Sequence, residues 1–343
     1  MKVSRMGFLR GGIAASAAIH ISGCSHLAGE SCGNRDTVRF GIVTDLHYAD
    51  LPPDPKAHGF VGRRFYRESV RKIREAVRLF NGRGVDFAVE LGDFKDNSGG
   101  REVTIRHLEA IEEEFARFNG PRYHVAGNHD FDCLAPHEFF SRTPNNGVVT
   151  QKGYYSFECK GVKFVVLNAC FDSKMAPYSR NNPWDDSNVP QEEMAWFSNE
   201  LSAACGKVVV FCHQRLDDSA EFRPIVKNAS AIRSLMEKSG KVCAVLTGHQ
   251  HCGGYHILNG IPYYNLRAMV CDSGEGENSY AVCSITTDGH FMVEGFCNAM
   301  SVKRTFCGES MKGCALRGCA DEAGLRGATH LPFNFDDAQG GFD

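Results

Sequence analysis

The sequence predicts an α/β protein in which two packed β-sheets are flanked by helices. Short apolar runs rich in Val and Ile, which are typical of buried strands, alternate with segments of helical periodicity up to about residue 250. The last third adds strand-like runs separated by Asn-Gly and Asp-Gly turn signals. These patterns indicate that α/β units enter and leave a β-rich layer.

The expected elements follow one another in a regular order. Five apolar runs are expected to form buried strands at 38–44, 87–91, 123–126, 208–212 and 242–247. A hairpin is expected at 154–158 and 162–167, and later strands at 256–258, 263–266, 280–286 and 291–297. Helices are expected at 62–81, 102–118, 191–204 and 230–239.

Two of these regions carry further information. In the first helix, an apolar stripe repeats at intervals of three and four residues, which leaves Lys72 among the residues of the solvated face. The segment 172–190 is rich in Pro, Asn, Ser and Asp and has no periodicity. Long irregular loops in compact domains are often functional, so this segment is expected to lie beside the substrate.

Length, composition and charge exclude some classes. The chain has 343 residues, of which 43% are hydrophobic and 23% charged, as in ordinary soluble globular proteins. A formal net charge of -3 provides no basic field for a phosphate backbone, so nucleic acid is not expected as an obligate partner. Four of the 15 cysteines lie in apolar runs and are expected to be small buried residues: Cys170, Cys212, Cys243 and Cys283.

The N-terminus has the pattern of an export signal. Three basic residues precede an apolar stretch at 11–21 that is too short to span a bilayer. The residues that end at Cys24, Ile-Ser-Gly-Cys, resemble the lipobox of bacterial lipoproteins, in which the cysteine is lipidated after cleavage. We therefore expect a periplasmic or cell-envelope lipoprotein whose membrane contact is a lipid on Cys24. The alternative is a cytoplasmic protein with an unstructured leader.

The expected domain organisation follows from these observations. It consists of a signal peptide at 1–24, a linker at 25–36, one folded domain at 37–302 and a poorly ordered tail containing Gly and Cys at 303–343.

Five polar clusters follow the five strand-like runs. They are Asp45-Leu-His47, Gly92-Asp93, Gly127-Asn-His-Asp130, His213 and Gly248-His-Gln-His251. Ligand sites of open α/β sheets form beyond the carboxyl ends of the strands, so we expect the clusters to converge. Any single cluster is weak evidence, because a lone His after an apolar run is usually a structural residue. A structural explanation of all five would need five independent coincidences.

The residue types in these clusters are those of a two-metal hydrolytic site. Imidazole and carboxylate groups are preferred ligands of the transition metals used in hydrolysis, such as Mn, Fe and Zn. Two ions about 3.5–4 Å apart would hold a bridging hydroxide and clamp the oxygens of a phosphate group. The expected ligands are Asp45, His47, Asp93 as the bridge, Asn128, His213, His249 and His251.

Two residues of the third cluster are expected to act on protons. His129 lies between an expected ligand, Asn128, and an acidic residue. It is better suited to donate a proton to the leaving group than to bind metal, and Asp130 is expected to orient it.

The ordered set of clusters, with Asp96, resembles the calcineurin-like metallophosphoesterase superfamily over about residues 38–298. The resemblance implies a four-layer αββα sandwich with a dinuclear metal site. It divides the ligands into one set of Asp45, His47 and His251, a second set of Asn128, His213 and His249, and Asp93 between them. It gives His129 the acid role. Asp96 stands where purple acid phosphatases have a metal-binding tyrosine, and it is expected next to the ligands.

Segments 40–50, 62–67 and 248–255 resemble the manganese-dependent ADP-ribose/CDP-alcohol diphosphatases. This resemblance implies a small nucleotide-like substrate. It suggests that Arg63 or Arg64 holds the second phosphate, because a guanidinium group matches phosphate oxygens. The alternative is that both arginines only begin the solvated face of a helix.

The leading hypothesis is therefore a dinuclear metal-dependent hydrolase that cleaves a phosphoester or phosphoanhydride bond of a nucleotide-type molecule. Alternatives within the superfamily are a phosphomonoesterase or a 3′,5′-cyclic-nucleotide phosphodiesterase, since 191–201 resembles a helix of bacterial members of that branch. A hypothesis from another class is a catalytically silent binding lipoprotein. Silent members generally lose ligands, whereas every expected position is filled here.

Overall fold

The computed structural model describes residues 37–54, 63–179, 182–218 and 226–304. The predictions for the signal peptide, Cys24, the linker and the tail beyond residue 304 lie outside the described residues. Within the described part, no helix has the length and apolar character needed to cross a membrane.

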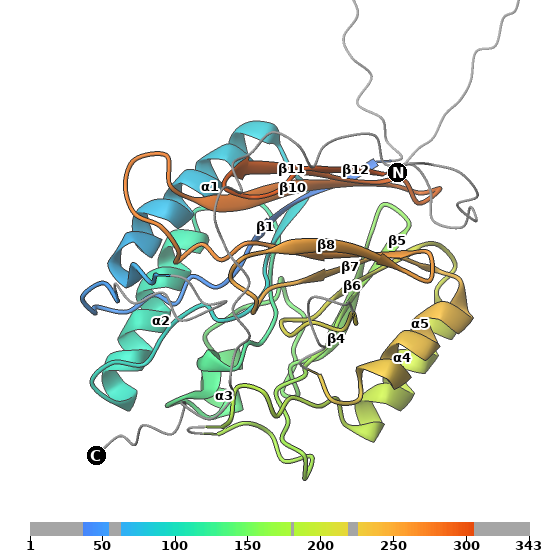
Figure 1. Ribbon diagram of the computed structural model, residues 1–343, viewed down its shortest axis with the longest axis horizontal. Helices are drawn as coiled ribbons and strands as arrows, with labels where there is room; N and C mark the ends of the chain where they lie inside the picture. The colour runs from blue at the N-terminus through green and yellow to red at the C-terminus, as the bar shows by residue number, and fades with distance from the viewer. Residues whose placement is uncertain (1–36, 55–62, 180–181, 219–225, 305–343) are drawn as a thin grey trace, which may run out of the picture. The chain divides into compact units, whose positions relative to one another are not determined.

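Two mixed six-stranded sheets form the centre of the folded domain (Figure 1). The first has the order β12-β11-β10-β1-β2-β3, and the second has the order β4-β5-β6-β7-β9-β8. The strands of the first sheet are β1 Thr37–Val43, β2 Phe87–Glu90, β3 Arg122–His124, β10 Ser279–Thr286, β11 Phe291–Cys297 and β12 Val302–Arg304. Those of the second are β4 Tyr155–Cys159, β5 Val162–Val166, β6 Val208–Phe211, β7 Val242–Thr247, β8 Gly254–Leu258 and β9 Ile261–Asn265.

An aromatic core joins the inner faces of the two sheets. Phe40 and Phe87 of the first sheet stack with ring centroids 4.9 Å apart, and Phe164 of the second sheet meets Phe40 edge-on at 5.5 Å. Offset-stacked and edge-to-face pairs are the favoured aromatic arrangements. The apolar face of every central strand is therefore buried against the opposite sheet.

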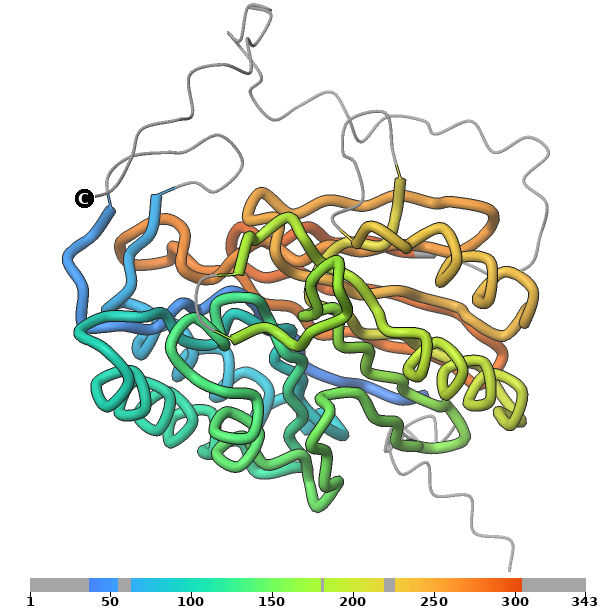
Figure 2. The backbone as a smooth tube through the Cα atoms, turned by 90° about the horizontal axis from the view of Figure 1, so that it is seen from below, coloured from blue at the N-terminus to red at the C-terminus, as the bar shows by residue number. Residues whose placement is uncertain are grey.

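Helices cover the outer faces of both sheets. The helices α1 Ser69–Arg83 and α2 Arg101–Phe115 bury their apolar stripes on the first sheet, and α4 Gln191–Ala203 and α5 Ala229–Ser239 bury theirs on the second. Figure 2 shows the two helix pairs on opposite sides of the strands. Three short elements complete the fold: the 3-10 turns η1 Tyr66–Glu68 and η2 His129–Phe131, and α3 Pro136–Phe140. The predicted four-layer αββα sandwich is confirmed.

The start of the first helix differs from the prediction. Residues 63–65 are not helical, because they are held by partners distant in sequence. Arg64 exchanges two backbone hydrogen bonds with Asp54, and the amide of Phe65 donates to the carbonyl of Val270 at 2.9 Å. Lys72 was expected on the solvated face but is fully buried, and its ammonium group donates to the carbonyl oxygens of Met269, Cys271 and Asp272.

The ten described cysteines are all free. The four expected to be small buried residues, Cys170, Cys212, Cys243 and Cys283, are at most 1% exposed, which confirms the prediction.

Candidate metal centre

The loops that follow β1, β2, β3, β6 and β7 meet at the carboxyl ends of their strands. Backbone hydrogen bonds tie these loops together: the amides of Asp45 and His47 donate to the carbonyls of Gly92 and Asp93 at 3.0 and 2.9 Å. In the second sheet, the amide of Gly248 donates to the carbonyl of His213 at 2.9 Å. The structure thus brings the five polar clusters into one place.

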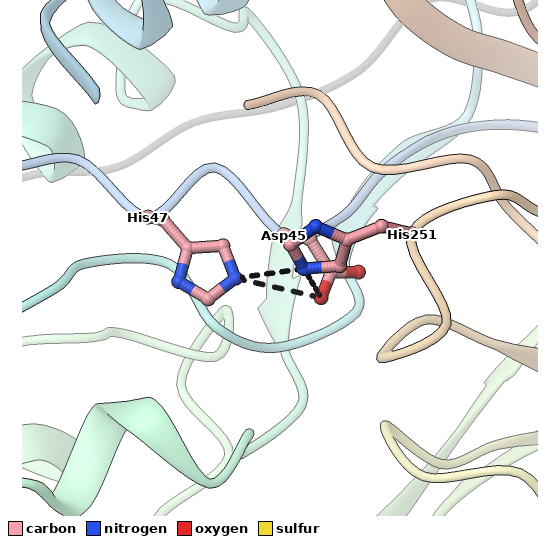
Figure 3. A group of neighbouring side chains, drawn as sticks. All are labelled: Asp45, His47 and His251. Carbon is pink, nitrogen blue, oxygen red and sulfur yellow. Dashed lines mark hydrogen bonds and ion pairs between the residues drawn. The ribbon is translucent and has the colours of Figure 1, made fainter. Parts of the chain in front are cut away.

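A first group of donors comprises Asp45, His47 and His251, which are at most 3% exposed (Figure 3). The Nε2 atoms of His47 and His251 lie 3.1 Å apart. Oδ1 of Asp45 lies 3.4 Å from Nε2 of His251 and 3.8 Å from Nε2 of His47. Three donor atoms from the loops after β1 and β7 therefore point at a common position.

A second group comprises Asp93, His213 and His249. Nε2 of His213 lies 3.1 Å from Oδ2 of Asp93 and 3.3 Å from Nδ1 of His249. Asn128, the fourth residue expected here, is 7% exposed, and its buried Oδ1 has no hydrogen-bond partner among the described residues. A buried amide oxygen without a partner is costly, so this atom is suited to a ligand.

Asp93 lies between the two groups. Its Oδ2 atom is 3.1 Å from Nε2 of His213 in the second group and 3.6 Å from Nε2 of His47 in the first. Its Oδ1 atom accepts a hydrogen bond from the backbone amide of His129 at 2.8 Å. One carboxylate is thus shared by both groups, as expected of a bridging ligand.

These residues fit two metal ions. Imidazole nitrogens that face each other at 3.1 and 3.3 Å, with carboxylate oxygens beside them, form donor sets of the kind that bind Mn, Fe or Zn. The first ion would be held by Asp45, His47 and His251, the second by Asn128, His213 and His249, and both by Asp93.

The outer atoms of the ligands are fixed by further contacts, which is typical of metal sites. Nδ1 of His47 lies 3.2 Å from Oδ2 of Asp96, and Nδ1 of His213 lies 2.8 Å from the carbonyl oxygen of Leu91. The second oxygen of Asp45 accepts hydrogen bonds from the hydroxyl of Thr44 and the amide of His249. His47, His213 and Asp45 therefore each keep one defined atom for the ion.

Four of these residues have left-handed backbone conformations. The φ angles are positive at Asp45, His47, Asp93 and His249, with values of 50°, 45°, 56° and 66°. Such conformations are unfavourable for residues other than glycine and occur at functional sites where the surrounding structure enforces them. The strand-end loops are therefore strained in a way that directs these side chains inward.

In the metal-free chain, the pKa values of several expected ligands are shifted toward the forms that bind metal. Burial alone would raise the pKa of Asp45, but hydrogen bonds to His251 and His47 hold it well below its usual value. Burial opposes ionisation of Asp93 as well, yet His213 and His129 lower the pKa of this carboxyl. Burial, followed by repulsion from His213, lowers the pKa of His249 to about 3. Ionised carboxylates and a neutral imidazole are the forms that bind metal.

His129 lies beside the two groups and is held by a different acid from the one predicted. Its Nδ1 atom forms a 2.8 Å contact with Oδ2 of Asp132 and lies 3.7 Å from Oδ1 of Asp96. Burial would lower the pKa of His129, but Asp93 and Asp96 raise it well above its usual value. These two carboxylates therefore favour the protonated form of His129 in the metal-free chain.

The prediction that Asp130 orients His129 is wrong. The carboxylate of Asp130 is fully buried and accepts hydrogen bonds from the backbone amides of Asp93, Phe94 and Gly127, at 2.8–3.1 Å. It therefore fixes the loop that carries Asp93. The 3-10 turn η2 places the residue three positions after His129, rather than the next one, against the imidazole.

One of the two candidate arginines, Arg64, contacts a residue of the site. Nη1 of Arg64 lies 3.3 Å from Oδ2 of Asp96, and its buried Nε has no hydrogen-bond partner among the described residues. Arg63 is exposed. The geometry therefore distinguishes two residues that the sequence left equivalent.

Two further residues near His129 were missed by the sequence analysis. Asp132 has a detectable signal, since residues three apart on a helical turn are neighbours. The buried Lys95 donates to the carbonyl oxygen of His129. A lysine two residues after a Gly-Asp pair has no local signal of that role.

A four-layer αββα fold with two His/Asp groups at the carboxyl ends of its strands defines a metallophosphoesterase. Residues 38–253 match the model of the calcineurin-like phosphoesterase family. The chain therefore belongs to the calcineurin-like phosphoesterase family.

Two relatives with the same name, and one solved structure, show more specifically which members of the family this chain is similar to. A manganese-dependent ADP-ribose/CDP-alcohol diphosphatase from Bos taurus is 30% identical over 309 residues, covering 75% of this chain and 90% of the relative. A protein of the same name from Oryza sativa is 26% identical over 278 residues, covering 68% and 84%. The crystal structure of a dimetal phosphatase from Danio rerio superimposes with a TM-score of 0.68 at 19% identity, covering 78% of this chain and 99% of that one, and supports the fold.

Proposed function

We propose that the protein hydrolyses the phosphoanhydride bond of small nucleoside diphosphate derivatives, of the ADP-ribose and CDP-alcohol type, with manganese as the metal. The observation that carries this proposal is the pair of His/Asp groups that share Asp93, with the guanidinium of Arg64 beside them. The substrate class is supported by the names of the relatives.

Each residue of the site has a distinct role in the proposed reaction. When bound, the metal ions supply Lewis acidity toward the phosphate oxygens and an activated water. His129, protonated and held by Asp132, donates its proton to the leaving oxygen. Asp130 keeps the Asp93 loop in its strained conformation through three amide hydrogen bonds.

Arg64 is the residue suited to the second phosphate. Its Nε donor is buried without a partner among the described residues, and its Nη1 atom remains close to Asp96. A phosphate oxygen would satisfy the unused donor, and the planar guanidinium group is suited to paired phosphate oxygens. A phosphomonoester has no second phosphate for this contact.

A substrate panel tests the proposal. The protein is loaded with Mn²⁺, Fe²⁺ or Zn²⁺ and assayed with ADP-ribose, CDP-choline, cyclic AMP, p-nitrophenyl phosphate and bis-p-nitrophenyl phosphate. We expect the highest kcat/KM with Mn²⁺ and the two diphosphates. Equal or higher kcat/KM for cyclic AMP or for p-nitrophenyl phosphate would reject the substrate class, and five intact substrates would reject the activity.

The arginine pair provides a matched mutational test. Arg64→Gln removes the unpartnered donor and is expected to raise the KM for ADP-ribose by roughly tenfold, the effect of losing a hydrogen bond between charged groups. The same change should alter the hydrolysis of p-nitrophenyl phosphate much less. Arg63→Gln, one residue away on the exposed surface, is the control and should leave both reactions unchanged.

The cyclic-nucleotide alternative receives no support from the helix that suggested it. Within α4, Met194, Phe197 and Leu201 are buried in the core beneath the helix, and Trp196 packs against Tyr154 with ring centroids 4.8 Å apart. Helix packing on the outer face of the second sheet accounts for this pattern.

The silent-lipoprotein alternative is separated by metal analysis. We expect about two equivalents of transition metal per chain in the wild type and a loss of metal and activity together in Asp93→Asn.

Export remains part of the proposal, with Cys24 as the lipidated residue. Labelling with a palmitate analogue in the wild type, and its loss in Cys24→Ala, tests it.

A further inference from the structure

A large aromatic side chain lies exposed beside the metal centre. Trp184 is 58% exposed, and its ring centroid is 6.1 Å from that of His249, with the planes tilted by 32°. The chain has two tryptophans, and the other, Trp196, is half-buried against Tyr154. Trp184 therefore presents an apolar surface to solvent next to a residue expected to bind metal.

The turn that carries Trp184 is held from both sides. Asp186 accepts the amide of Ser173 at 3.0 Å and pairs with the ammonium of Lys227 at 2.6 Å. The carbonyl of Pro183 accepts the amide of Asp186 at 3.2 Å and the hydroxyl of the buried Tyr178 at 3.3 Å. These bonds hold the turn in place, so a ligand that uses the ring binds a preorganised surface.

We propose that Trp184 is the surface on which the base of a nucleotide substrate stacks while its phosphates lie at the metal centre. This inference rests on the proposed function and deepens it. Bases stack well on indole rings, and a single aromatic face accepts purines and pyrimidines alike because every base has a π-face. A platform of this kind is compatible with both adenine and cytosine nucleotides.

Kinetics provide the first test. In Trp184→Ala, the KM for ADP-ribose and CDP-choline is expected to rise about tenfold, while the base-free substrate ribose 5-diphosphate keeps its KM. Trp184→Phe retains an aromatic face and should show a smaller rise. Met292→Ala, which shortens an exposed apolar side chain on β11, is the control for a general surface effect. An equal rise for the base-free substrate would overturn the inference.

Fluorescence provides a second test that does not depend on turnover. Trp196→Phe leaves Trp184 as the only tryptophan of the chain. Titration of this Mn²⁺-loaded variant with AMP is expected to quench the emission, whereas ribose 5-phosphate at equal occupancy should not. Quenching by both ligands alike, or by neither, would refute stacking on Trp184. If the wild type hydrolyses no nucleotide, the proposed function fails, and the AMP titration still decides whether a base stacks on Trp184.

Discussion

At the scale of single residues, the centre depends on which acid contacts which base. Four carboxyl groups lie around His129 and the ligands, and they have separate tasks. Asp93 faces both metal groups, Asp96 contacts His47, and Asp132 contacts His129. Asp130 instead accepts three backbone amides. Asp130 and Asp132 are close in sequence, yet Asp130 fixes the backbone and Asp132 holds the imidazole of His129.

The first prediction separates these two acids. Asp132→Asn removes one of the contacts that raise the pKa of His129. A general acid is active while protonated, so activity is lost as the pH rises through its pKa, and a lower pKa moves that loss to lower pH. We expect the alkaline limb of the pH profile of kcat to move to lower pH. At pH 8 kcat should fall by roughly tenfold, a part of the 10²–10⁴-fold that a general acid contributes.

Asp130→Asn is the comparison for this prediction. An amide group has only one acceptor oxygen, so at least one of the three backbone amides loses its partner. We expect a loss of about 1–3 kcal/mol in the free energy of unfolding, measured in urea, with no specific shift of the alkaline limb. A shifted pH profile in Asp130→Asn, together with an unchanged profile in Asp132→Asn, would contradict this prediction and show that Asp130 orients His129.

At the scale of elements, the centre depends on how closely the strand-end loops approach one another. Gly127, after β3, packs directly on the loop after β2. A Cβ atom at this position would lie 2.2 Å from the amide nitrogen of Asp93 and 2.4 Å from its Oδ1. The φ angle of Gly127 is not positive, so the requirement for glycine here comes from space and not from backbone conformation.

The second prediction follows from this contact. Gly127→Ala is expected to displace the carboxylate of Asp93 and to weaken Mn²⁺ binding by about 10–100-fold, measured by titration and metal analysis. Overpacking should also cost about 1–3 kcal/mol in the free energy of unfolding. Gly82→Ala is the control, because a Cβ there meets no atom within 4 Å and α1 gains up to about 1 kcal/mol of helix propensity. Unchanged Mn²⁺ affinity in Gly127→Ala would show that the loops adjust without moving Asp93.

The elements also show what the sequence could predict. Each buried strand is an apolar run, and each predicted ligand follows such a run directly, so the strands and their convergence were readable from local pattern. Lys72 and the start of α1 were not, because a loop about 200 residues away determines them. Asp132 was missed because sequence adjacency favoured Asp130, whereas the turn η2 brings the third residue onward to His129.

At the scale of the whole molecule, the two sheets meet at the metal centre. Asp45, His47 and Asp93 follow strands of the first sheet, whereas His213, His249 and His251 follow strands of the second. Each group of three therefore contains residues from both sheets. In the metal-free chain, the carboxylate and imidazole atoms of these groups lie 3.1–3.8 Å from one another in the protein interior, which is a costly arrangement for charges removed from water.

The third prediction is that metal binding and folding are coupled. A ligand that binds only the folded state stabilises it by about 2.7 kcal/mol per site at a free concentration 100 times its Kd. Removal of metal with EDTA should therefore lower the Tm, and Mn²⁺ should restore it in a concentration-dependent way, followed by differential scanning calorimetry with metal content measured in parallel. Asp93→Asn should lose most of this response because the removed carboxylate serves both groups, while Arg63→Gln should keep it. Loss of metal from the wild type without any fall in Tm would contradict this prediction. The core between the sheets, which includes Phe40, Phe87 and Phe164, would then be sufficient to hold them together, and the ions would serve only catalysis.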